Sequence, residues 1–490
     1  MKTLSSHVAL KPMLSPRSLL TGALLLAVAG CANYSGIDSK AELRKPETFA
    51  TQQTFAGTTG DWPAAQWWRQ FQDAQLNALM DEAMAHSPSL EAAAARVRAA
   101  RAYTGVTRSA EYPVIDASGD ISYQKFSKNW IYPSPYGGAS MFNNTLHLNA
   151  SYDLDFWGRN RAGVKSAVSQ QREAEAEQQS TALLLTSSIA KTYIEFDRLL
   201  TERDVVARSL QQREKIFALT QQRLDAGLDN RAELKQAESE LPVLRGQLAQ
   251  VDEAIGAVRN ALAELVGAGP DRGLKIERPH LALAAAPIAL PPNLPVDLLG
   301  RRPDIVAARW QAEAAQQEVA VAKAEFYPNI SLTGYIGASS LGLDKLLRSG
   351  SEENGIGPAL SLPIFAGGRL RQNLKRQYAA YDSAVANYNT TLTAALRDVA
   401  DQLNGLHWLQ ARQREQRNAA AIAHTALDLA TARYKAGLGN YLSVLNAETT
   451  VLAQDRLGVE LGAQAMALRV NLIKALGGGY DTTTQTAANN

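Results

Sequence analysis

Two aspartates in the stretch YDLDFWGRN, Asp153 and Asp155, are the residues best placed to do chemistry. On a β-strand, residues i and i+2 point to the same face, so these carboxylates could form an acid–base pair or bind a metal ion. Both kinds of site need a further partner, and the six histidines are scattered with no pair at metal-ligand spacing. We therefore interpret Asp153 and Asp155, together with Asp116 and Asp120, as side chains on the water-exposed face of strands.

Other candidate sites also fail to indicate an enzyme. In Arg301-Arg302-Pro303-Asp304, proline and aspartate predict the start of a helix rather than an anion site. The glycines at 477–479 follow a helical segment and lack the context of a phosphate-binding loop. No serine or cysteine lies in an activating motif. We predict no catalytic activity, no cofactor and no metal.

The segment LHLNASYDLDF (146–156) alternates without a break between apolar and polar residues. Its two faces prefer different surroundings: core and water in a soluble sheet, or lipid and water in a membrane barrel. Segments with a similar pattern lie at 114–124, 329–339 and 356–365. Each has about the length that a tilted strand needs to cross a bilayer. Aromatic residues near the segment ends are typical of membrane interfaces, although loop packing would also explain them.

The chain contains the same series of elements twice. AEYPVIDASGDISY (110–123) corresponds to EFYPNISLTGYIGA (325–338), and LDAGLDN corresponds to YKAGLGN. In each half a helix and two strands precede a long proline-free segment, which predicts a helix of about 100 Å. Gly227 and Gly437 end these helices, and a shorter helix then returns. The predicted organisation comprises a signal peptide (1–30), a tether (31–61), a first repeat (62–270) with hairpin 158–268, a linker (271–295), a second repeat (296–476) with hairpin 368–476, and a flexible tail (477–490).

The N-terminus has a basic leader and the apolar run LLTGALLLAVAG, which ends at Cys31, the only cysteine in the chain. Val28-Ala29-Gly30-Cys31 resembles a bacterial lipobox, in which cleavage leaves an acylated N-terminal cysteine. Ala32 after the cysteine is compatible with delivery to the outer membrane. Elsewhere, no apolar run reaches the roughly 18 residues of a membrane-spanning helix. The net charge of +2 gives no support for a nucleic-acid partner.

Four strands cannot close a membrane barrel, because about eight strands is the observed minimum. An open sheet in lipid would leave unpaired backbone groups, at several kcal/mol each. Several chains must therefore share one barrel. Two chains would fill the interior with side chains, whereas three would give twelve strands and a water-filled lumen. Asp116, Asp120, Asp153 and Asp155 need water, which favours three chains.

From the lipobox onward, the chain resembles the TolC/OprM-like outer-membrane efflux lipoproteins, the NodT-type outer membrane factors of tripartite pumps. The similar stretches are DWPAAQWWRQFQDAQLNALM (61–80), YDLDFWGRNR (152–161), LPVDLLGRRPDI (294–305), LSLPIFAGGRLR (360–371), RYKAGLGNYLSVLNAE (433–448) and LIKALGGGY (472–480). The resemblance implies mixed α and transmembrane β structure: a homotrimer that shares a twelve-strand barrel continued by a periplasmic α-helical barrel. It implies a passive exit duct for drugs or other small toxic compounds. The expected partners are a periplasmic adaptor protein and an inner-membrane transporter of the resistance-nodulation-division or major-facilitator type.

The resemblance also assigns residues. Gly227, Leu228, Gly437 and Leu438 correspond to the hairpin tips on which the adaptor docks, although the glycines alone could simply end helices. Leu442 and Asn446 correspond to a leucine and an acidic residue that ring the closed periplasmic aperture. The acid is an asparagine here, so we expect weaker cation binding at that level. Two alternative functions remain: the exit duct of a type I protein secretion system, and a structural lipoprotein that spans the periplasm.

Overall fold

The computed structural model describes residues 34–481 apart from 52, 56–59, 283–290 and 292–293. The predicted signal peptide, Cys31 and the end of the C-terminal tail lie outside the described residues. The chain divides into two compact units. The first comprises residues up to 42, 99–172 and 310–386, and it contains the strands. The second is helical in its regular structure and comprises residues 43–98, 173–309 and those from 387 onward.

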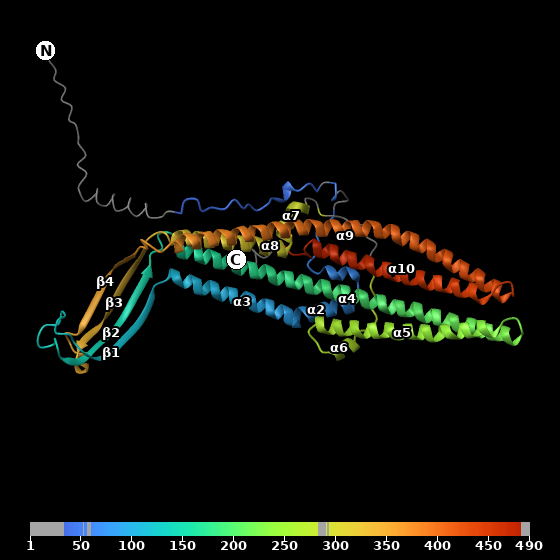
Figure 1. Ribbon diagram of the computed structural model, residues 1–490, viewed down its shortest axis with the longest axis horizontal. Helices are drawn as coiled ribbons and strands as arrows, with labels where there is room; N and C mark the ends of the chain where they lie inside the picture. Colours follow the sequence, from blue (N-terminus) through green and yellow to red (C-terminus); the bar gives the residue numbers. More distant parts are fainter. Residues whose placement is uncertain (1–33, 52, 56–59, 283–290, 292–293, 482–490) are drawn as a thin grey trace, which may run out of the picture. The chain divides into compact units, whose positions relative to one another are not determined.

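In the first unit, the described strands form one antiparallel sheet in the order β1-β2-β3-β4 (Figure 1). Each strand lies beside its neighbour in sequence, so the sheet consists of two hairpins placed edge to edge. β1 and β4 are the free edges. The strands are β1 (Val114–Lys125), β2 (Ser140–Asp153), β3 (Asn329–Leu341) and β4 (Glu352–Ser361).

Strand ends are set by the partner strand, and this makes two of the predicted ranges wrong. β2 begins at Ser140, opposite Lys125, instead of at 146, and it stops at Asp153, opposite Ser331. β4 covers Glu352–Ser361 instead of 356–365, because its partner β3 extends from Ala338 back to Asn329 along this pair. Beyond Asp153 one further backbone hydrogen bond, from Leu154 N to Ile330 O at 3.0 Å, closes the β2–β3 pair before the chain turns away at Asp155.

The α-helices, including the short α6 and α7, are distributed over both halves of the chain. Each half contains a helix before its strands and a long helical hairpin after them. The helices are α2 (Ala74–His86), α3 (Pro88–Arg108), α4 (Arg159–Asp225), α5 (Arg231–Leu265), α6 (Pro270–Leu274), α7 (Leu294–Arg301), α8 (Pro303–Ala324), α9 (Arg369–Lys435) and α10 (Tyr441–Ala475).

The two halves have helices of equal length. α4 and α9 have 67 residues each, and α5 and α10 have 35 each. A left-handed glycine ends each long helix, and an asparagine side chain caps the returning one. α8 begins at Pro303, and Asp304 in its first turn pairs with Arg302 at 2.6 Å. The predicted helix start in this segment is therefore confirmed.

Residues 34–42, which belong to the predicted tether, pack against the rest of the first unit. Tyr34 contacts Phe326 edge-on at 5.5 Å between ring centroids, and Ile37 is buried beside Phe326 and Leu374. Ser39 donates a hydrogen bond to Asp382. Apolar residues within a polar segment therefore fix the chain to α8 and α9.

Candidate functional site

Most polar residues of the four strands lie on one face of the sheet. This polar face consists of the even-numbered residues of β1 and the odd-numbered residues of β2, β3 and β4, because the register keeps the alternation in step. Asn149 Nδ2 donates to Asp116 Oδ2 at 3.1 Å and to Ser118 Oγ at 3.0 Å. Asp120 and Asp153 lie on the same face. The structure thus brings three of the four predicted aspartates to one surface.

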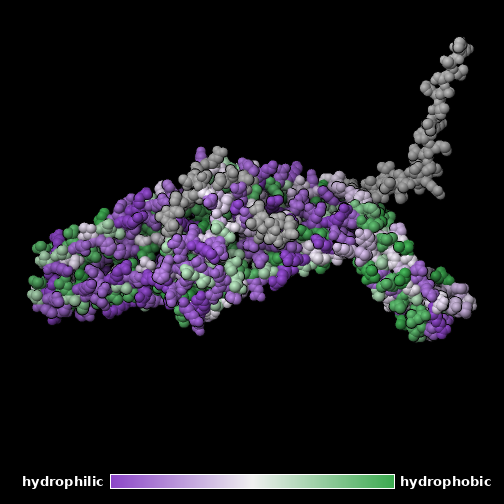
Figure 2. Space-filling view, turned by 180° about the vertical axis from the view of Figure 1, so that it is seen from behind, coloured by the Kyte–Doolittle hydropathy of each residue, from purple (hydrophilic) through white to green (hydrophobic). Residues whose placement is uncertain are grey.

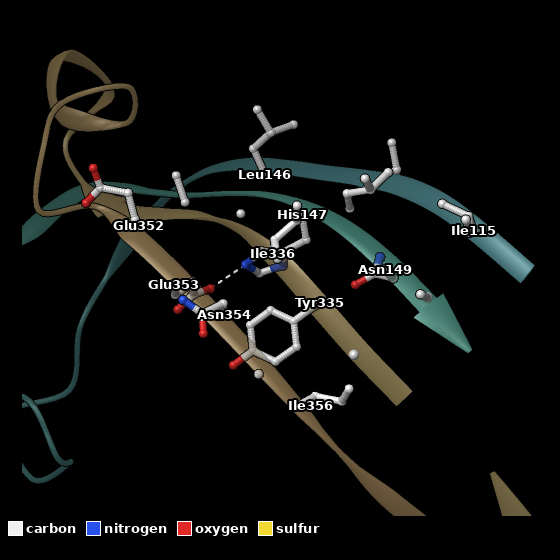
Figure 3. A pocket seen from close by; sticks show the side chains of 17 residues that line it. Ile115, Leu146, His147, Asn149, Tyr335, Ile336, Glu352, Glu353, Asn354 and Ile356 are labelled. Atoms are coloured by element: carbon white, nitrogen blue, oxygen red, sulfur yellow. Dashed lines mark hydrogen bonds and ion pairs between the residues drawn. The ribbon is translucent and has the colours of Figure 1, made fainter. Parts of the chain in front are cut away.

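His147 and Glu353 form a contact on this face that the sequence analysis missed. His147 Nε2 is within hydrogen-bond contact of Glu353 Oε1, and Ser339 Oγ donates to the same carboxylate oxygen at 2.6 Å (Figure 3). The Tyr335 ring lies 5.4 Å from the imidazole. His147, Tyr335 and Glu353, with further residues of all four strands, border a cavity of about 920 Å³. Correct pairing of β2, β3 and β4 would have been the only signal, since these residues are far apart in sequence.

Glycines lie beneath the two rings. A Cβ atom on Gly337 would come within 2.5 Å of the His147 ring, and one on Gly355 within 2.7 Å of the Tyr335 ring. Both rings therefore lie along the sheet instead of projecting from it. The polar face of β4 continues with Gly357 and Ala359, so its side chains beyond Glu353 are small or absent.

The opposite, apolar face is exposed in the single chain. Hydrophobic residues gather on the sheet in Figure 2, and they include Ile115, Ile121, Leu148, Ile336, Ile356 and Leu360. A water-soluble sheet would cover such a face with other elements. The outward residues of this sheet instead suit a lipid environment. In the part of the chain that the structure describes, no helix is both long and apolar enough to cross a membrane.

Asp155 lies beyond the end of β2, so the prediction that it shares a strand face with Asp153 is wrong. Its φ of 43° turns the chain after β2, and its carboxylate accepts hydrogen bonds from the N–H groups of Asn160 and Arg161 at 3.0 Å. It therefore caps the first turn of α4. Partial burial raises the pKa of Asp155, but the two backbone donors and the Arg161 side chain outweigh it and lower that pKa.

The predicted hairpin tips have the same geometry in both halves. Gly227 and Gly437 have φ of 72° and 76°. Leu228 N donates to Arg223 O, and Leu438 N to Arg433 O, each at 2.8 Å. This pattern is the Schellman turn that ends helices. The leucine that follows each glycine is 64% exposed in the first tip and 71% in the second.

A buried network joins the two tips, and sequence reasoning did not find it. Arg223 forms a double hydrogen bond with Asp229 at 2.9 and 3.0 Å, and Tyr434 Oη donates to Asp229 at 2.5 Å. Arg223 also donates to the backbone oxygen of Tyr434 at 2.9 Å, and Thr220 contacts the Tyr434 hydroxyl at the same distance. Burial raises the pKa of Asp229, but Arg223 and Tyr434 outweigh it, so the net shift is downward. These hydrogen bonds therefore hold the turns that carry the exposed Leu228 and Leu438.

Leu442 and Asn446 lie one turn apart on the exposed face of α10, just after the second tip. Leu442 is 49% exposed, and Leu445 beside Asn446 is buried. The corresponding first-half residues, Ala232 and Gln236, are also exposed and uncharged. Neither hairpin thus presents a carboxylate at these four positions.

A second buried charge cluster lies between the hairpins. Arg213 pairs with Glu240 and approaches Glu448 Oε2 at 3.6 Å. Both Glu448 oxygens are buried without a hydrogen-bond donor. Burial, opposed by Arg213 and reinforced by Glu240, raises the pKa of Glu448 to about 7. Among the described residues, no group of three His, Cys, Asp or Glu side chains could hold a metal ion.

Comparison with known proteins explains this combination of features. Residues 79–268 and 294–478 match the family model for outer membrane efflux proteins. The chain is 38% identical to the fusaric acid resistance protein FusA of Burkholderia cepacia, over 72% of this chain and 67% of FusA. It is 29% identical to the multidrug resistance outer membrane protein MdtQ of Escherichia coli O157:H7, over 93% of this chain and 97% of MdtQ.

A solved structure gives the same result. The outer membrane protein VceC of Vibrio cholerae is 41% identical, with a TM-score of 0.81 over 86% of this chain and all of VceC. In this fold, three chains share a twelve-strand β-barrel that a long α-helical barrel continues, and the assembly is an efflux channel of the outer membrane, not an enzyme. The duplicated hairpins, the two-faced sheet and the sequence match agree, and the chain belongs to the outer membrane efflux protein family.

Proposed function

We propose that this channel releases small toxic organic compounds that an adaptor and an inner-membrane transporter deliver to its helical end. The observation that carries the proposal is the duplicated tip, in which Leu228 and Leu438 are exposed on a rigid, buried base. A helix end needs the glycine but not an exposed leucine after it. The same leucine at both tips supports an adaptor that binds apolar side chains at two similar places per chain.

The class of exported compound is proposed from the relatives. FusA is named for resistance to fusaric acid and MdtQ for multidrug resistance. We expect aromatic acids and drugs of similar size, selected by a transporter of the major-facilitator or resistance-nodulation-division type. The channel itself contributes a passive, water-filled path past Asp116, Asp120 and Asp153 on the polar face.

Lipid attachment at Cys31 is part of the proposal. Tyr34 follows Cys31 closely and contacts the Tyr327 hydroxyl at 3.3 Å, and Tyr327 stacks on Trp157 at 4.5 Å. Trp157 follows β2 and Tyr327 precedes β3, so these aromatic side chains lie where the sheet meets the helices. Aromatic residues favour the membrane interface, which supports an acyl chain entering the bilayer beside this junction.

Leu442 and Asn446 are proposed to line the periplasmic aperture. Three leucines would narrow the opening in the trimer. Three asparagines would surround it with uncharged amides, so we expect weak cation binding there compared with a ring of carboxylates.

The docking proposal is tested with the double variant Leu228→Asp, Leu438→Asp. Both side chains are exposed, so the variant should fold, and two aspartates per chain should prevent an apolar partner from binding. We expect loss of efflux-dependent resistance while the trimer stays intact on native gels. Leu347→Asp, on the exposed β3–β4 loop, is the matched control and should keep resistance. Unchanged resistance in the double variant would refute docking at the tips.

A further inference from the structure

The two edge strands of the sheet need partners in the membrane, and we propose the register in which they meet. We infer that β1 of one chain pairs with β4 of a second copy so that Lys125 lies opposite the partner's Glu352. This proposal rests on the trimeric barrel of the proposed function, and it goes further by naming the residues that meet at the seam between chains.

Hydrogen bonds within the sheet determine which backbone groups face the seam. Phe126 N bonds Ala139 O at 2.9 Å, and Ser339 N bonds Ser351 O at 2.8 Å. Phe126 is even-numbered like the polar-face residues of β1, and Ser351 is odd-numbered like those of β4. The polar-face residues of β1 and β4 therefore direct their backbone N–H and C=O groups toward the neighbouring strand of their own sheet. In an antiparallel strand, successive residues direct these groups to opposite sides. Apolar-face residues of β1 and β4 therefore present N–H and C=O groups to the next chain.

Pro358 agrees with this assignment. It lies on the apolar face of β4 opposite Leu332, so the side on which its N–H is missing is the free edge. β4 consequently offers one hydrogen-bond donor fewer to the next chain than a strand without proline. Within its own sheet, Pro358 interrupts no hydrogen bond.

Charge selects the register at the outer end. Lys125 and Glu352 both lie on the apolar face, each at the loop end of an edge strand, and both are exposed. Among the described residues, Lys125 makes no ion pair, and Glu352 accepts from backbone N–H groups, those of Gly350 at 2.6 Å and of Glu352 itself, but pairs with no cation. Opposite charges at facing strand positions stabilise pairing. Lys125 opposite the partner subunit's Glu352 satisfies both groups at the level of the outer lipid headgroups.

The same register pairs the rest of the edge by shape. Ile121 faces Ile356 of the partner subunit, and Ala117 faces Leu360 of the partner subunit. Gly119 lies opposite Pro358 of the partner subunit, where the absence of a side chain leaves room for the proline ring. On the polar face, Ser118 meets Ala359 of the partner subunit. Tyr123 faces Asn354 of the partner subunit, whereas Ile121 and Ala117 have apolar neighbours across the seam.

Shifts of two residues keep the faces aligned but break the Lys125–Glu352 pair. A shift in one direction places Ile121 opposite Asn354 of the partner subunit and Lys125 beyond the end of β4. A shift in the other direction places Lys125 opposite Asn354 of the partner subunit and Ile121 opposite Pro358 of the partner subunit. Barrel geometry links register to strand tilt. In a barrel of twelve strands, the proposed register displaces the pairing by about 18 residues around the full circle. The strands then tilt by about 45° from the barrel axis, whereas the second shift would tilt them by about 55°, which is steeper than in typical barrels.

Disulfide trapping tests the register. Ser118 and the partner's Ala359 would form a pair without backbone hydrogen bonds, at a Cα separation of about 4.5 Å, which suits a disulfide. Cys31 is the only native cysteine, so engineered pairs have a clean background once acylation or Cys31→Ser removes its thiol. The matched controls combine Ser118→Cys with Gly357→Cys or with Ser361→Cys, each displaced by two residues. Those partners would be about 7–8 Å away.

We expect Ser118→Cys with Ala359→Cys to give covalent dimers and trimers on non-reducing gels, roughly tenfold more than either control pair. Stronger cross-linking with Gly357→Cys or Ser361→Cys would overturn the register and leave the trimeric duct intact. A monomer that cross-links in no pair would overturn both the register and the duct.

A charge swap gives an independent readout. Lys125→Glu or Glu352→Lys alone should lower the temperature at which the trimer dissociates in detergent, and the two together should restore it. Lys128→Glu, in the adjoining loop, should have no such effect. Equal loss in the single and double variants would contradict the Lys125–Glu352 pair.

Discussion

Glu448 is a buried acid whose two carboxylate oxygens receive no hydrogen bond. Its negative charge is balanced only by the nearby guanidinium of Arg213. Arg213 also serves Glu240, so the cluster holds two carboxylates and one cation. One proton shared by this cluster balances its charge. The raised pKa of Glu448, about 7, reflects that need.

The pH dependence of stability follows from this shift. An unfolded glutamate titrates near 4.3, so between about pH 4.5 and pH 7 the folded chain holds a proton that the unfolded chain lacks. Stability from Glu448 is therefore present at low pH and is lost as pH rises through about 7. Glu448→Gln mimics the protonated acid and should make the detergent-solubilised trimer more stable at pH 8, with little change at pH 5.

Thermal unfolding at the two pH values measures this effect. Glu173, whose pKa is also raised to about 7 by burial and by Glu177, will retain part of the wild-type slope. An unchanged slope in the Glu448→Gln trimer would show that Glu448 is ionised in the folded chain throughout this range.

At the scale of elements, helix ends were predictable within a few residues because local chemistry sets them. Gly227, Gly437 and the asparagine caps Asn230 and Asn440 lie next to the positions that they fix. Strand ends were less predictable, because β2 and β4 stop where a distant partner stops. For the same reason the Asp229–Tyr434 bond escaped notice, since its two residues come from different halves of the duplicated chain.

Gly437→Ala tests the left-handed turn at the second tip. No atom lies within 4 Å of the added Cβ, so the cost is confined to the backbone conformation, about 1 kcal/mol. We expect the Leu438 amide to exchange its hydrogen roughly fivefold faster, since 1 kcal/mol corresponds to that factor. Hydrogen exchange measured by mass spectrometry over residues 433–440 gives the readout.

Two controls separate conformation from size. Gly437→Asn should exchange more slowly than Gly437→Ala, because asparagine tolerates a positive φ. Gly256→Ala lies in the interior of α5 with open space around it and should leave the tip unchanged. Equal exchange in Gly437→Ala and wild type would mean that the tip does not depend on this glycine.

At the scale of the whole molecule, membrane affinity has two sources: the proposed acyl group on Cys31 and the apolar face of the sheet. The second source is large, because exposed residues such as Ile115, Ile121 and Ile356 are repeated in three chains. We therefore expect Cys31→Ser to lose the mass of the acyl modification and still place assembled trimers in the outer-membrane fraction, in reduced amount. Intact-mass measurement and membrane fractionation check the two parts. Absence of the variant from the outer membrane would show that delivery requires the lipid.

The glycines beneath His147 and Tyr335 affect how a molecule leaves the barrel. Because both rings lie along the wall and β4 adds small side chains, a departing compound meets few protruding groups there. Its dwell time near the exit is then short, and its return is limited mainly by dilution into the surrounding medium. Export by such a channel is made effectively one-way by the volume outside the cell, not by an affinity difference along the wall.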